Sequence, residues 1–339
     1  MKASVLTKYG SPDFFELREV EKPLPKDNEV LVKVHAASIN SWDDEILRGT
    51  PFVNRLMVGI FKPTKIQILG CDIAGRVEAV GKNVTLLEPG DEVFGDLSRG
   101  GWGGFAEYVC APENAVILKP TNMTFEQASA VPQAGLLALQ GLRKGNILPE
   151  ENQAGEINSG RKVLINGASG GVGSFAVPLV KLYGAEVTGV CSTGKMEFVR
   201  SLGADLVIDY TQENFTKNGQ HYDLILDVKG FHSIFDYKRA LTPRGIYVMV
   251  GGTTALVNQL IFLRPWISMT DNKKMSLLLH KPNKGLGFMK ELLEAGKIVP
   301  VIDRCYPLNE VAEAFRYFGE GQARGKAKGK IVITLEHRN

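Results

Sequence analysis

The stretch Val163-Leu-Ile-Asn-Gly-Ala-Ser-Gly-Gly-Val-Gly-Ser-Phe-Ala-Val-Pro-Leu-Val180 decides the fold of this chain. Its apolar beginning predicts a buried parallel strand over residues 163–166, and the apolar spacing further along predicts a helix over residues 174–183. A glycine-rich turn lies between the two. A strand, a glycine turn and a helix in this order are typical of the nucleotide-binding unit of a doubly wound α/β fold.

The glycine turn has the spacing of a dinucleotide-binding motif, Ala168-x-Gly170-x-x-Gly173, with alanine in the first position. Gly170 allows the backbone to approach a pyrophosphate, and Gly173 allows the helix to pack closely on the strand. Unpaired N–H groups at the start of the helix would bind the phosphates. An ordinary glycine-rich loop is the alternative interpretation. The predicted cofactor-binding residues of this turn are Ala168, Ser169, Gly170, Gly171, Val172 and Gly173.

The composition is that of an ordinary globular protein with two domains. The chain has 339 residues, of which 44% are hydrophobic and 23% are charged. The net charge of +3 is too small to indicate nucleic-acid binding, and no apolar run reaches the ~20 residues of a membrane span. The four cysteines form no metal-binding pair, and the first residues do not resemble a secretion signal. We therefore expect a cytoplasmic protein with reduced thiols.

Two patterns divide the chain. Up to residue 120 the sequence is typical of short strands, and we expect them at 2–7, 29–36, 74–80 and 105–109. Thr124 is then expected to cap a helix. Strands expected at 163–166, 186–191, 206–209, 223–227, 246–250 and 275–280 alternate with helices, which predicts a doubly wound parallel sheet. A last strand at 331–335 is expected to rejoin the β-rich part, so the expected domains are 1–124 with 281–339, and 125–280.

The tip of the second strand of this sheet indicates which nucleotide binds. In NAD-selective proteins an acidic residue at this tip binds the ribose 2′-hydroxyl. Here two hydroxyl residues and a lysine stand there with no carboxylate, which favours the 2′-phosphate of NADPH over NADH. A helix cap for the hydroxyl residues and a solvated position for the lysine are the alternatives. The predicted cofactor-binding residues of this edge are Ser192, Thr193, Lys195, Tyr210 (for the phosphate or the adenine) and, for the nicotinamide half, Gly251 and Gly252.

The chain resembles the medium-chain dehydrogenase/reductases, and more narrowly their zinc-free quinone oxidoreductase (zeta-crystallin-like) branch. The resemblance covers essentially the whole chain and rests on residues 37–43, 69–81, 89–95, 104–109, 166–173, 191–209 and 292–300, and on the closing Gly-Lys-Ile-Val-Ile. It implies a GroES-like β-rich catalytic domain together with a Rossmann nucleotide-binding domain. It also implies a homodimer, in which the strand expected at 275–280 lies at the sheet edge and pairs with its copy.

The same resemblance predicts that no metal is bound. The positions that hold catalytic zinc in the zinc-dependent relatives correspond here to Asn40, Cys71 and Gln133. Neutral amides are poor zinc ligands, and one thiol cannot hold the ion alone. The cysteine-rich lobe of those relatives corresponds to residues 96–104, which contain no cysteine.

Without a metal ion, the acceptor must already be electrophilic, as quinones and α,β-unsaturated carbonyl compounds are. The resemblance places Asn40 next to the nicotinamide, where its amide would donate a hydrogen bond to the growing enolate. An asparagine that stabilises a turn is the alternative. The residues expected to line the substrate pocket are Trp42, Cys71, Trp102 and Gln133, with core packing as the alternative for the tryptophans.

The predicted function is therefore an NADPH-dependent, zinc-independent oxidoreductase acting on small electrophilic acceptors. Two alternatives stay open. An enoyl-thioester reductase would use the same fold and cofactor with a basic entry for the pantetheine phosphates. A redox sensor or structural protein would bind NADPH without turnover.

Overall fold

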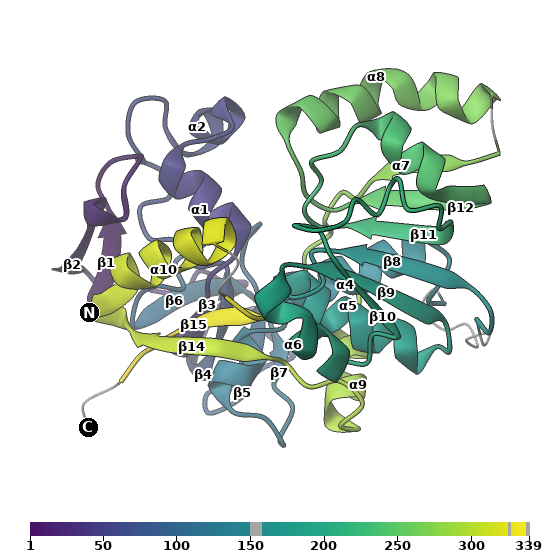
Figure 1. The fold of residues 1–339 in the computed structure, drawn as a ribbon. Coiled ribbons are helices and arrows are strands. Elements are labelled where there is room, and N and C mark those ends of the chain that lie inside the picture. The colour runs from purple at the N-terminus through teal and green to yellow at the C-terminus, as the bar shows by residue number, and fades with distance from the viewer. Residues whose placement is uncertain (150–157, 271, 325–326, 337–339) are drawn as a thin grey trace. The chain divides into compact units, whose positions relative to one another are not determined.

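The computed structural model describes residues 1–149, 158–270, 272–324 and 327–336. The chain forms two compact units (Figure 1). The first comprises Met1–Ala134, Pro282–Gly296 and Pro300–Asn339, and the second comprises Gly135–Lys281 with Lys297–Val299. The first unit therefore contains both ends of the chain.

The first unit is built around a seven-stranded sheet that is mostly antiparallel. Its strand order is β14-β15-β3-β4-β5-β7, with β6 also paired to β3, while β1 and β2 form a separate ladder. Its strands are β1 (Lys2–Leu6), β2 (Phe15–Glu19), β3 (Glu29–Ser38), β4 (Asp72–Val80), β5 (Glu92–Asp96), β6 (Tyr108–Pro112), β7 (Ile117–Leu118), β14 (Ile302–Pro307) and β15 (Lys330–Thr334). Its helices are α1 (Ser41–Arg48), α2 (Phe52–Val58), α3 (Phe125–Ser129), α9 (Leu286–Glu294) and α10 (Val311–Arg324).

The strand from the end of the chain, β15, pairs with β3 from its beginning. The pairing is antiparallel and sets Val332 opposite Ser38. Just beyond β3, the Ile39 N–H donates to the Ile331 carbonyl at 3.0 Å, so the ladder continues past the end of the strand. The expectation that the last strand rejoins the β-rich part is confirmed.

Local sequence signals explain some element ends and miss others. Thr124 caps α3 as expected, in a reciprocal pair of hydrogen bonds with Gln127. The strand expected at 105–109 is wrong in position, since β6 covers Tyr108–Pro112. Only Tyr108 and Val109 of the expected stretch lie in the ladder with β3. Ala106 instead makes an isolated antiparallel bridge to Ala3 of β1, and the Phe105 N–H donates to the Leu69 carbonyl at 3.0 Å.

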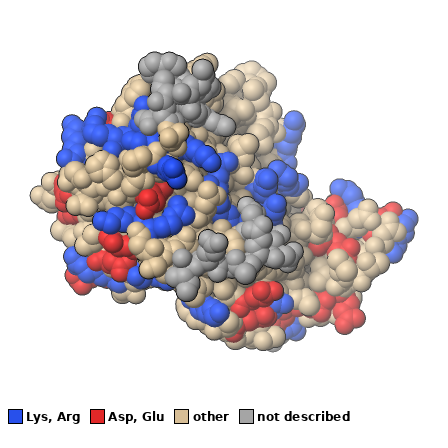
Figure 2. Space-filling model, turned by 90° about the vertical axis from the view of Figure 1, so that its right-hand side faces the viewer, with Lys and Arg blue, Asp and Glu red and all other residues tan. Residues whose placement is uncertain are grey.

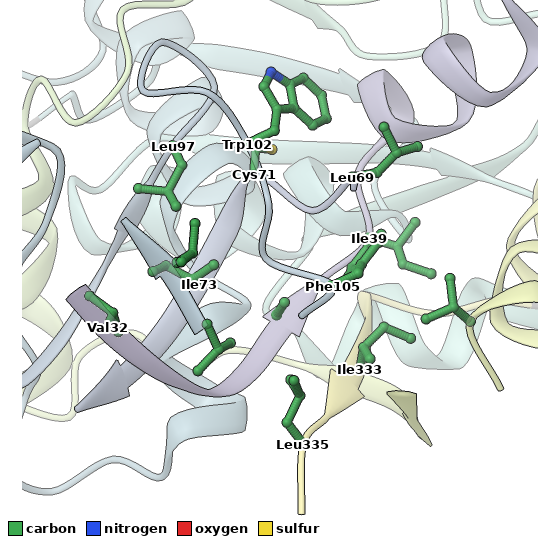
Figure 3. Packing of buried hydrophobic residues seen from close by; sticks show 14 of the residues in the cluster. Val32, Ile39, Leu69, Cys71, Ile73, Leu97, Trp102, Phe105, Ile333 and Leu335 are labelled. Carbon is green, nitrogen blue, oxygen red and sulfur yellow. The ribbon is translucent and has the colours of Figure 1, made fainter. Parts of the chain in front are cut away.

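A large hydrophobic cluster lies in the first unit (Figure 3), beside two small ones around Ala3 and Ala36. Val32 of β3 and Ile73 of β4 are fully buried in it. Leu97, Phe105 and Ile333 belong to the same cluster. Burying one large apolar side chain of this kind contributes about 1.5–3 kcal/mol.

The second unit holds a six-stranded sheet in which every neighbouring pair is parallel. The strand order is β10-β9-β8-β11-β12-β13, and all six expected strands are present. The strands are β8 (Lys162–Asn166), β9 (Glu186–Cys191), β10 (Leu206–Asp209), β11 (Tyr222–Asp227), β12 (Leu241–Met249) and β13 (Lys274–Leu277). The helices are α4 (Pro132–Lys144), which begins in the first unit, α5 (Gly171–Leu182), α6 (Met196–Ser201), α7 (Ile234–Ala240) and α8 (Thr254–Thr270).

Helices cover both faces of this sheet, as the alternation of side chains along β11 shows. Leu226 is buried against α4, where a Cβ on Gly141 would lie 2.6 Å from the Leu226 Cδ1. Ile225 points the other way, into a buried cluster with Ile234 and Tyr237 of α7. The doubly wound α/β fold predicted from the sequence is confirmed.

The surface of the molecule shows a sheet edge and mixed charge. Strand β13 is an edge strand of the six-stranded sheet, as expected. Lysines and arginines are spread over the face drawn in Figure 2, with acidic side chains among them. Within the described part of the chain, no helix is both long enough and apolar enough to cross a bilayer.

Candidate active site

The sheet of the first unit brings three distant parts of the chain to one point. In the ladder between β3 and β4, Ser38 lies opposite Asp72. In the ladder between β3 and β15, Ser38 lies opposite Val332. The pairing continues beyond β3 through the bond from the Ile39 N–H to the Ile331 carbonyl, and this brings Asn40 opposite Lys330. Because residues two apart on a strand share a face, the side chains of Asn40, Asp72 and Lys330 meet.

The buried Asn40 side chain has a charged partner on each side. Its Nδ2 donates to the Asp72 Oδ2 at 2.9 Å, and its Oδ1 accepts a hydrogen bond from the Lys330 Nζ. The Lys330 Nζ also lies 3.6 Å from the Asp72 Oδ2, and both of these side chains are buried. A buried charge is tolerated when it is paired and hydrogen-bonded, and this cluster meets both conditions.

Cys71 lies between two side-chain amides. The Asn40 Nδ2 is 3.6 Å from the Cys71 Sγ, and the Gln133 Nε2 is 3.5 Å from it. The structure thus brings together the three residues that the resemblance aligned with zinc ligands. Burial raises the pKa of the Cys71 thiol well above its usual value, so the sulfur is held as a neutral thiol between two N–H donors.

The Asp72 carboxyl joins this cluster to the start of α4. The backbone N–H of Gln133 donates to both of its oxygens at 3.1 Å, and the Ser38 hydroxyl donates at 3.3 Å. Burial raises the pKa of Asp72, and the nearby Lys330 ammonium opposes that rise. Each of these neighbours donates a hydrogen bond to Asp72, and an ionised carboxylate can accept all of them.

A second buried carboxyl, Asp43, fixes the turn that carries Asn40. It accepts hydrogen bonds from the backbone N–H of Asn40 at 2.8 Å and from that of Gly70 at 2.9 Å. Asn40 is the N-cap of α1, so Asp43 ties the start of this helix to the segment that leads into β4. Burial raises the pKa of Asp43 to about 7.

Two tryptophans form an aromatic pair in the same unit. The rings of Trp42 and Trp102 meet edge to face, with centroids 5.4 Å apart at 81°. Trp102 is buried with a φ of +66°, a conformation that costs a bulky residue about 1–3 kcal/mol. Trp102 belongs to the same hydrophobic cluster as Cys71 (Figure 3), and Trp42 packs against that cluster. The four expected pocket residues therefore lie in two contacting pairs, Cys71 with Gln133 and Trp42 with Trp102.

The glycine turn of the second unit has the geometry that the motif predicts. A Cβ on Gly173 would lie 2.3 Å from the Gly167 carbonyl oxygen and 2.5 Å from the Ala168 Cα, so only glycine permits this contact. Gly170 is the N-cap of α5, and the nearest neighbour of a Cβ there would be 3.6 Å away. The turn is therefore tight at Gly173 and open at Gly170, where the first N–H groups of α5 lack intrahelical partners.

A buried carboxyl fixes the place where this turn begins. Asp227, at the end of β11, accepts hydrogen bonds from the Asn166 Nδ2 at 2.8 Å and from the Tyr247 hydroxyl at 2.7 Å. Asn166 is the last residue of β8 and directly precedes the turn. Burial raises the pKa of Asp227 to about 6.

The tips of β9 and β10 bring the remaining predicted residues together. Asp209 is opposite Cys191 in this parallel pair, so Tyr210 follows directly beside the Ser192–Lys195 segment. The Lys195 side chain is buried, whereas Thr193 and Tyr210 are exposed. Tyr210 also meets the ring of Phe231 at 6.3 Å between centroids.

The Asp209 carboxylate is a feature of this edge that the sequence analysis missed. It accepts hydrogen bonds from the Thr193 and Thr211 hydroxyls, which lower its pKa and keep it ionised. The proton of the Thr193 hydroxyl is therefore directed to Asp209. The prediction of a 2′-phosphate site at this edge therefore depends on Ser192, Lys195 and Tyr210 more than on Thr193.

Gly251 and Gly252 extend the parallel pairing of β11 and β12 beyond the strand ends. The Gly230 N–H donates to the Gly251 carbonyl at 3.0 Å, and Gly230 bridges to Gly252. A Cβ on Gly252 would lie 2.6 Å from the Met249 side chain. The Met249 side chain would have to move to admit a larger residue at this carboxyl edge of the sheet, where the sequence placed the nicotinamide half of the cofactor.

Lys330 is the main residue that the sequence analysis missed in the first unit. Its only sequence signal is a lysine at the start of an apolar strand, Lys330-Ile-Val-Ile333, and many exposed strand ends share that pattern. Asp227 gave a similarly weak signal, an acidic residue at the end of an apolar run.

Comparison with known proteins gives the family. Two family models match the chain, the alcohol dehydrogenase GroES-like domain over residues 26–121 and the zinc-binding dehydrogenase over residues 202–333. A 2-methylene-furan-3-one reductase of Solanum lycopersicum is 35% identical, over 98% of this chain and 79% of its own length. A mitochondrial NAD(P)H oxidoreductase of Mus musculus is 33% identical, over 98% and 89%. The solved structure of the quinone oxidoreductase from Coxiella burnetii has a TM-score of 0.83 at 29% identity, with 99% of each chain covered.

This chain belongs to the medium-chain dehydrogenase/reductase superfamily. Its GroES-like unit and its parallel nucleotide-binding sheet are the two parts that define the superfamily fold. The resemblance drawn from the sequence is confirmed, including its direction toward the quinone oxidoreductases.

We expect Asp43 to make the free energy of unfolding fall as pH rises. Its pKa is about 7 in the folded protein against 3.8 for the ordinary side chain, so the folded state favours the protonated form. This stabilisation is complete below about pH 4 and is lost as pH rises through about 7. Urea unfolding at about pH 5 and about pH 8 should therefore show a larger decrease for the wild type than for Asp43→Asn.

The substitution itself should cost about 1–3 kcal/mol at both pH values, because the new amide turns an N–H toward a backbone donor. Asp205→Asn is the matched control, since the ion pair with Lys181 lowers the pKa of Asp205 and keeps its titration below this window. Equal pH dependence in the wild type and Asp43→Asn would contradict the assignment.

Proposed function

We propose that this protein is an NADPH-dependent, zinc-independent reductase of quinones and α,β-unsaturated carbonyl compounds. It is an NAD(P)H-dependent oxidoreductase by its family. The observation that carries the finer proposal is the cluster of Asn40, Cys71 and Gln133, in which two amides and a neutral thiol stand where zinc-dependent relatives present metal ligands. The Lys330 ammonium, hydrogen-bonded to Asn40, provides the cluster with a positive charge.

The residues of the second unit fit a dinucleotide. The open space at Gly170 and the N-terminus of α5 suit a diphosphate, and Gly173 keeps the helix close enough to present its N–H groups. Lys195, with Ser192, supports NADPH, since a 2′-phosphate gains from a cation that a 2′-hydroxyl does not need. When bound, the dihydronicotinamide supplies the hydride.

The chemistry of the donors argues against a zinc site in the first unit. Cys71, Asp72 and Asp96 offer ligand atoms within 4.8 Å of one another. Asp72 is already engaged by the Lys330 ammonium and by the Asn40 amide, and a divalent ion placed there would be repelled by that ammonium. Zinc sites are built from three or four thiolate, imidazole and carboxylate ligands, and the side chains beside Cys71 here are the neutral amides of Asn40 and Gln133.

An acceptor that no metal polarises must be electrophilic by itself. In a quinone or an enone, the charge of an added hydride spreads onto oxygen, and a hydrogen-bond donor at that oxygen lowers the barrier. Asn40 offers such a donor. One N–H of its Nδ2 is held by Asp72, and the other donates to the Cys71 Sγ at 3.6 Å, a weak acceptor that a substrate oxygen can replace.

The decisive experiment measures NADPH oxidation by metal-analysed protein after dialysis against a chelator. The panel of acceptors contains a quinone, an enone, an enal and an enoyl thioester. We expect turnover with the first three and zinc far below one equivalent per chain. Asn40→Ala should lower kcat by about 100-fold, because one donor to the developing oxyanion is removed.

Other results would redirect the proposal. A preference for the enoyl thioester would identify the alternative reductase. Tight NADPH binding without turnover on any acceptor would identify a non-catalytic sensor or structural protein. Activity that requires one tightly held zinc per chain would refute zinc independence.

Lys195→Ala should weaken NADPH binding by about tenfold or more and change NADH binding by less than about twofold, because only NADPH carries the 2′-phosphate. Fluorescence titration of both nucleotides gives the two dissociation constants. Lys181→Ala is the control, since this lysine of the same unit is paired with Asp205 on the surface. Equal losses for NADPH and NADH in Lys195→Ala would remove the 2′-phosphate assignment.

We also infer a homodimer, in which β13 pairs with its copy across the exposed sheet edge. An edge strand presents unpaired backbone groups that a second copy can satisfy. Light scattering should give a mass near twice the 37.1 kDa of one chain, and the mass of a single chain would contradict the inference.

The cytoplasm is the compartment that we propose. Each cysteine in the described part of the chain is a free thiol, as a reducing compartment requires. The relative from Mus musculus is named as a mitochondrial protein, so mitochondria are the alternative compartment.

A further inference from the structure

We propose that Lys330 is a positioning residue that holds the Asn40 amide in a single orientation. The consequence of this inference for catalysis rests on the proposed function. The contacts that support the inference do not, since they all lie within the first unit. These contacts are the hydrogen bond from the Lys330 Nζ to the Asn40 Oδ1 and the one from the Asn40 Nδ2 to the Asp72 Oδ2.

The chemistry of the two neighbours fixes which way the amide faces. An ammonium can only donate hydrogen bonds, so the atom of Asn40 that faces Lys330 must be the oxygen. An ionised carboxylate can only accept, so the atom that faces Asp72 must be the nitrogen. Both requirements select the same orientation. A flipped amide would set a donor against the ammonium and an oxygen against the carboxylate, and both contacts would be lost inside a buried cluster.

The backbone delivers Lys330 to this position. Gly329 has a φ of +67°, and a Cβ there would lie 2.3 Å from the Val301 carbonyl oxygen, so glycine is required immediately before the lysine. The backbone N–H of Lys330 then donates to the same Val301 carbonyl at 2.9 Å. Since β15 continues in register with β3, the lysine side chain arrives opposite Asn40.

The orientation has a direct consequence for the acceptor. With the Asn40 oxygen turned to Lys330, the Nδ2 keeps one N–H for Asp72 and points the other at the weakly accepting Cys71 Sγ, where an acceptor oxygen can take its place. If the amide could flip, it would present its own oxygen to the developing enolate, and two negative oxygens would repel each other. Lys330 therefore acts on the acceptor through Asn40.

The test observes the Asn40 amide directly, by NMR of protein labelled with ¹⁵N at asparagine. The side-chain signals of Asn40 are identified by their loss in Asn40→Ser. In Lys330→Met, which keeps the length of the side chain and removes its charge, we expect these signals to shift and their hydrogen exchange to accelerate by about tenfold or more. Lys330→Arg, which restores a donor-only cation, should return the exchange toward the wild-type rate.

The matched control is Lys119→Met. Among the described residues of the first unit, Lys119 is a second buried lysine with a carboxylate partner, Glu92 at 3.2 Å, and it donates to the carbonyls of Pro120 and Met123. This variant should leave the Asn40 signals unchanged even where it lowers stability. Asn40 signals and exchange that are the same in folded Lys330→Met as in the wild type would overturn the proposal.

A second variant keeps the proposal testable if Lys330→Met does not fold. Asp72→Asn has the same shape as the wild type but can both donate and accept, so one of the two requirements on the amide is removed. We expect the same kind of change in the Asn40 signals, and unchanged signals would again overturn the proposal.

Kinetics separate this inference from the proposed function. We expect Lys330→Met to lower kcat for the quinone by about tenfold or more while the KM for NADPH stays within about twofold. Changed Asn40 signals with an unchanged kcat would support the positioning and refute the role of Asn40 in catalysis. Unchanged signals would refute the positioning whatever the kinetics.

Discussion

The antiparallel pairing of β15 with β3 is the constraint on which the first unit depends. It joins the two ends of a chain whose middle forms a separate unit, and it adds β14 and β15 to the sheet. The same pairing sets Lys330 opposite Asn40 and so supplies the cation that the buried Asp72 needs. If β15 were displaced, Asp72 would be a buried carboxyl without its ion-pair partner, a loss that typically costs about 3–5 kcal/mol.

In the proposed function, the cluster formed in this way takes the place of a metal centre. Its positive charge belongs to a lysine side chain that is fixed by the sheet, and its neighbours are amides, a neutral thiol and carboxyls. A lysine cannot polarise a carbonyl as strongly as a coordinated metal ion, but it can hold a hydrogen-bond donor in place. The arrangement therefore suits acceptors that are electrophilic without help, which is the basis of the proposed substrate class.

In the second unit, too, buried carboxyl groups hold polar side chains in place by hydrogen bonds. Asp227 holds Asn166 at the start of the glycine turn, and Asp209 holds Thr193 at the tip of β9. The first contact supports the predicted diphosphate site. The second engages one of the hydroxyl groups that the sequence analysis assigned to a 2′-phosphate, so the proposed preference for NADPH depends more on Lys195 than the sequence suggested.

The sequence by itself determined what lies within a few residues: the strand, glycine turn and helix around Gly170, the cap of α3 at Thr124, and the six strands of the parallel sheet. These features depend on local hydrogen bonds, glycine geometry and apolar spacing, and residues that are neighbours in the sequence specify all three. Only the tertiary structure decided that Lys330 meets Asn40, 290 residues away, and that Asp209 takes the Thr193 hydroxyl. Such contacts depend on which strands pair and in which register, and a shift of one residue would turn each of these side chains to the opposite face of its sheet.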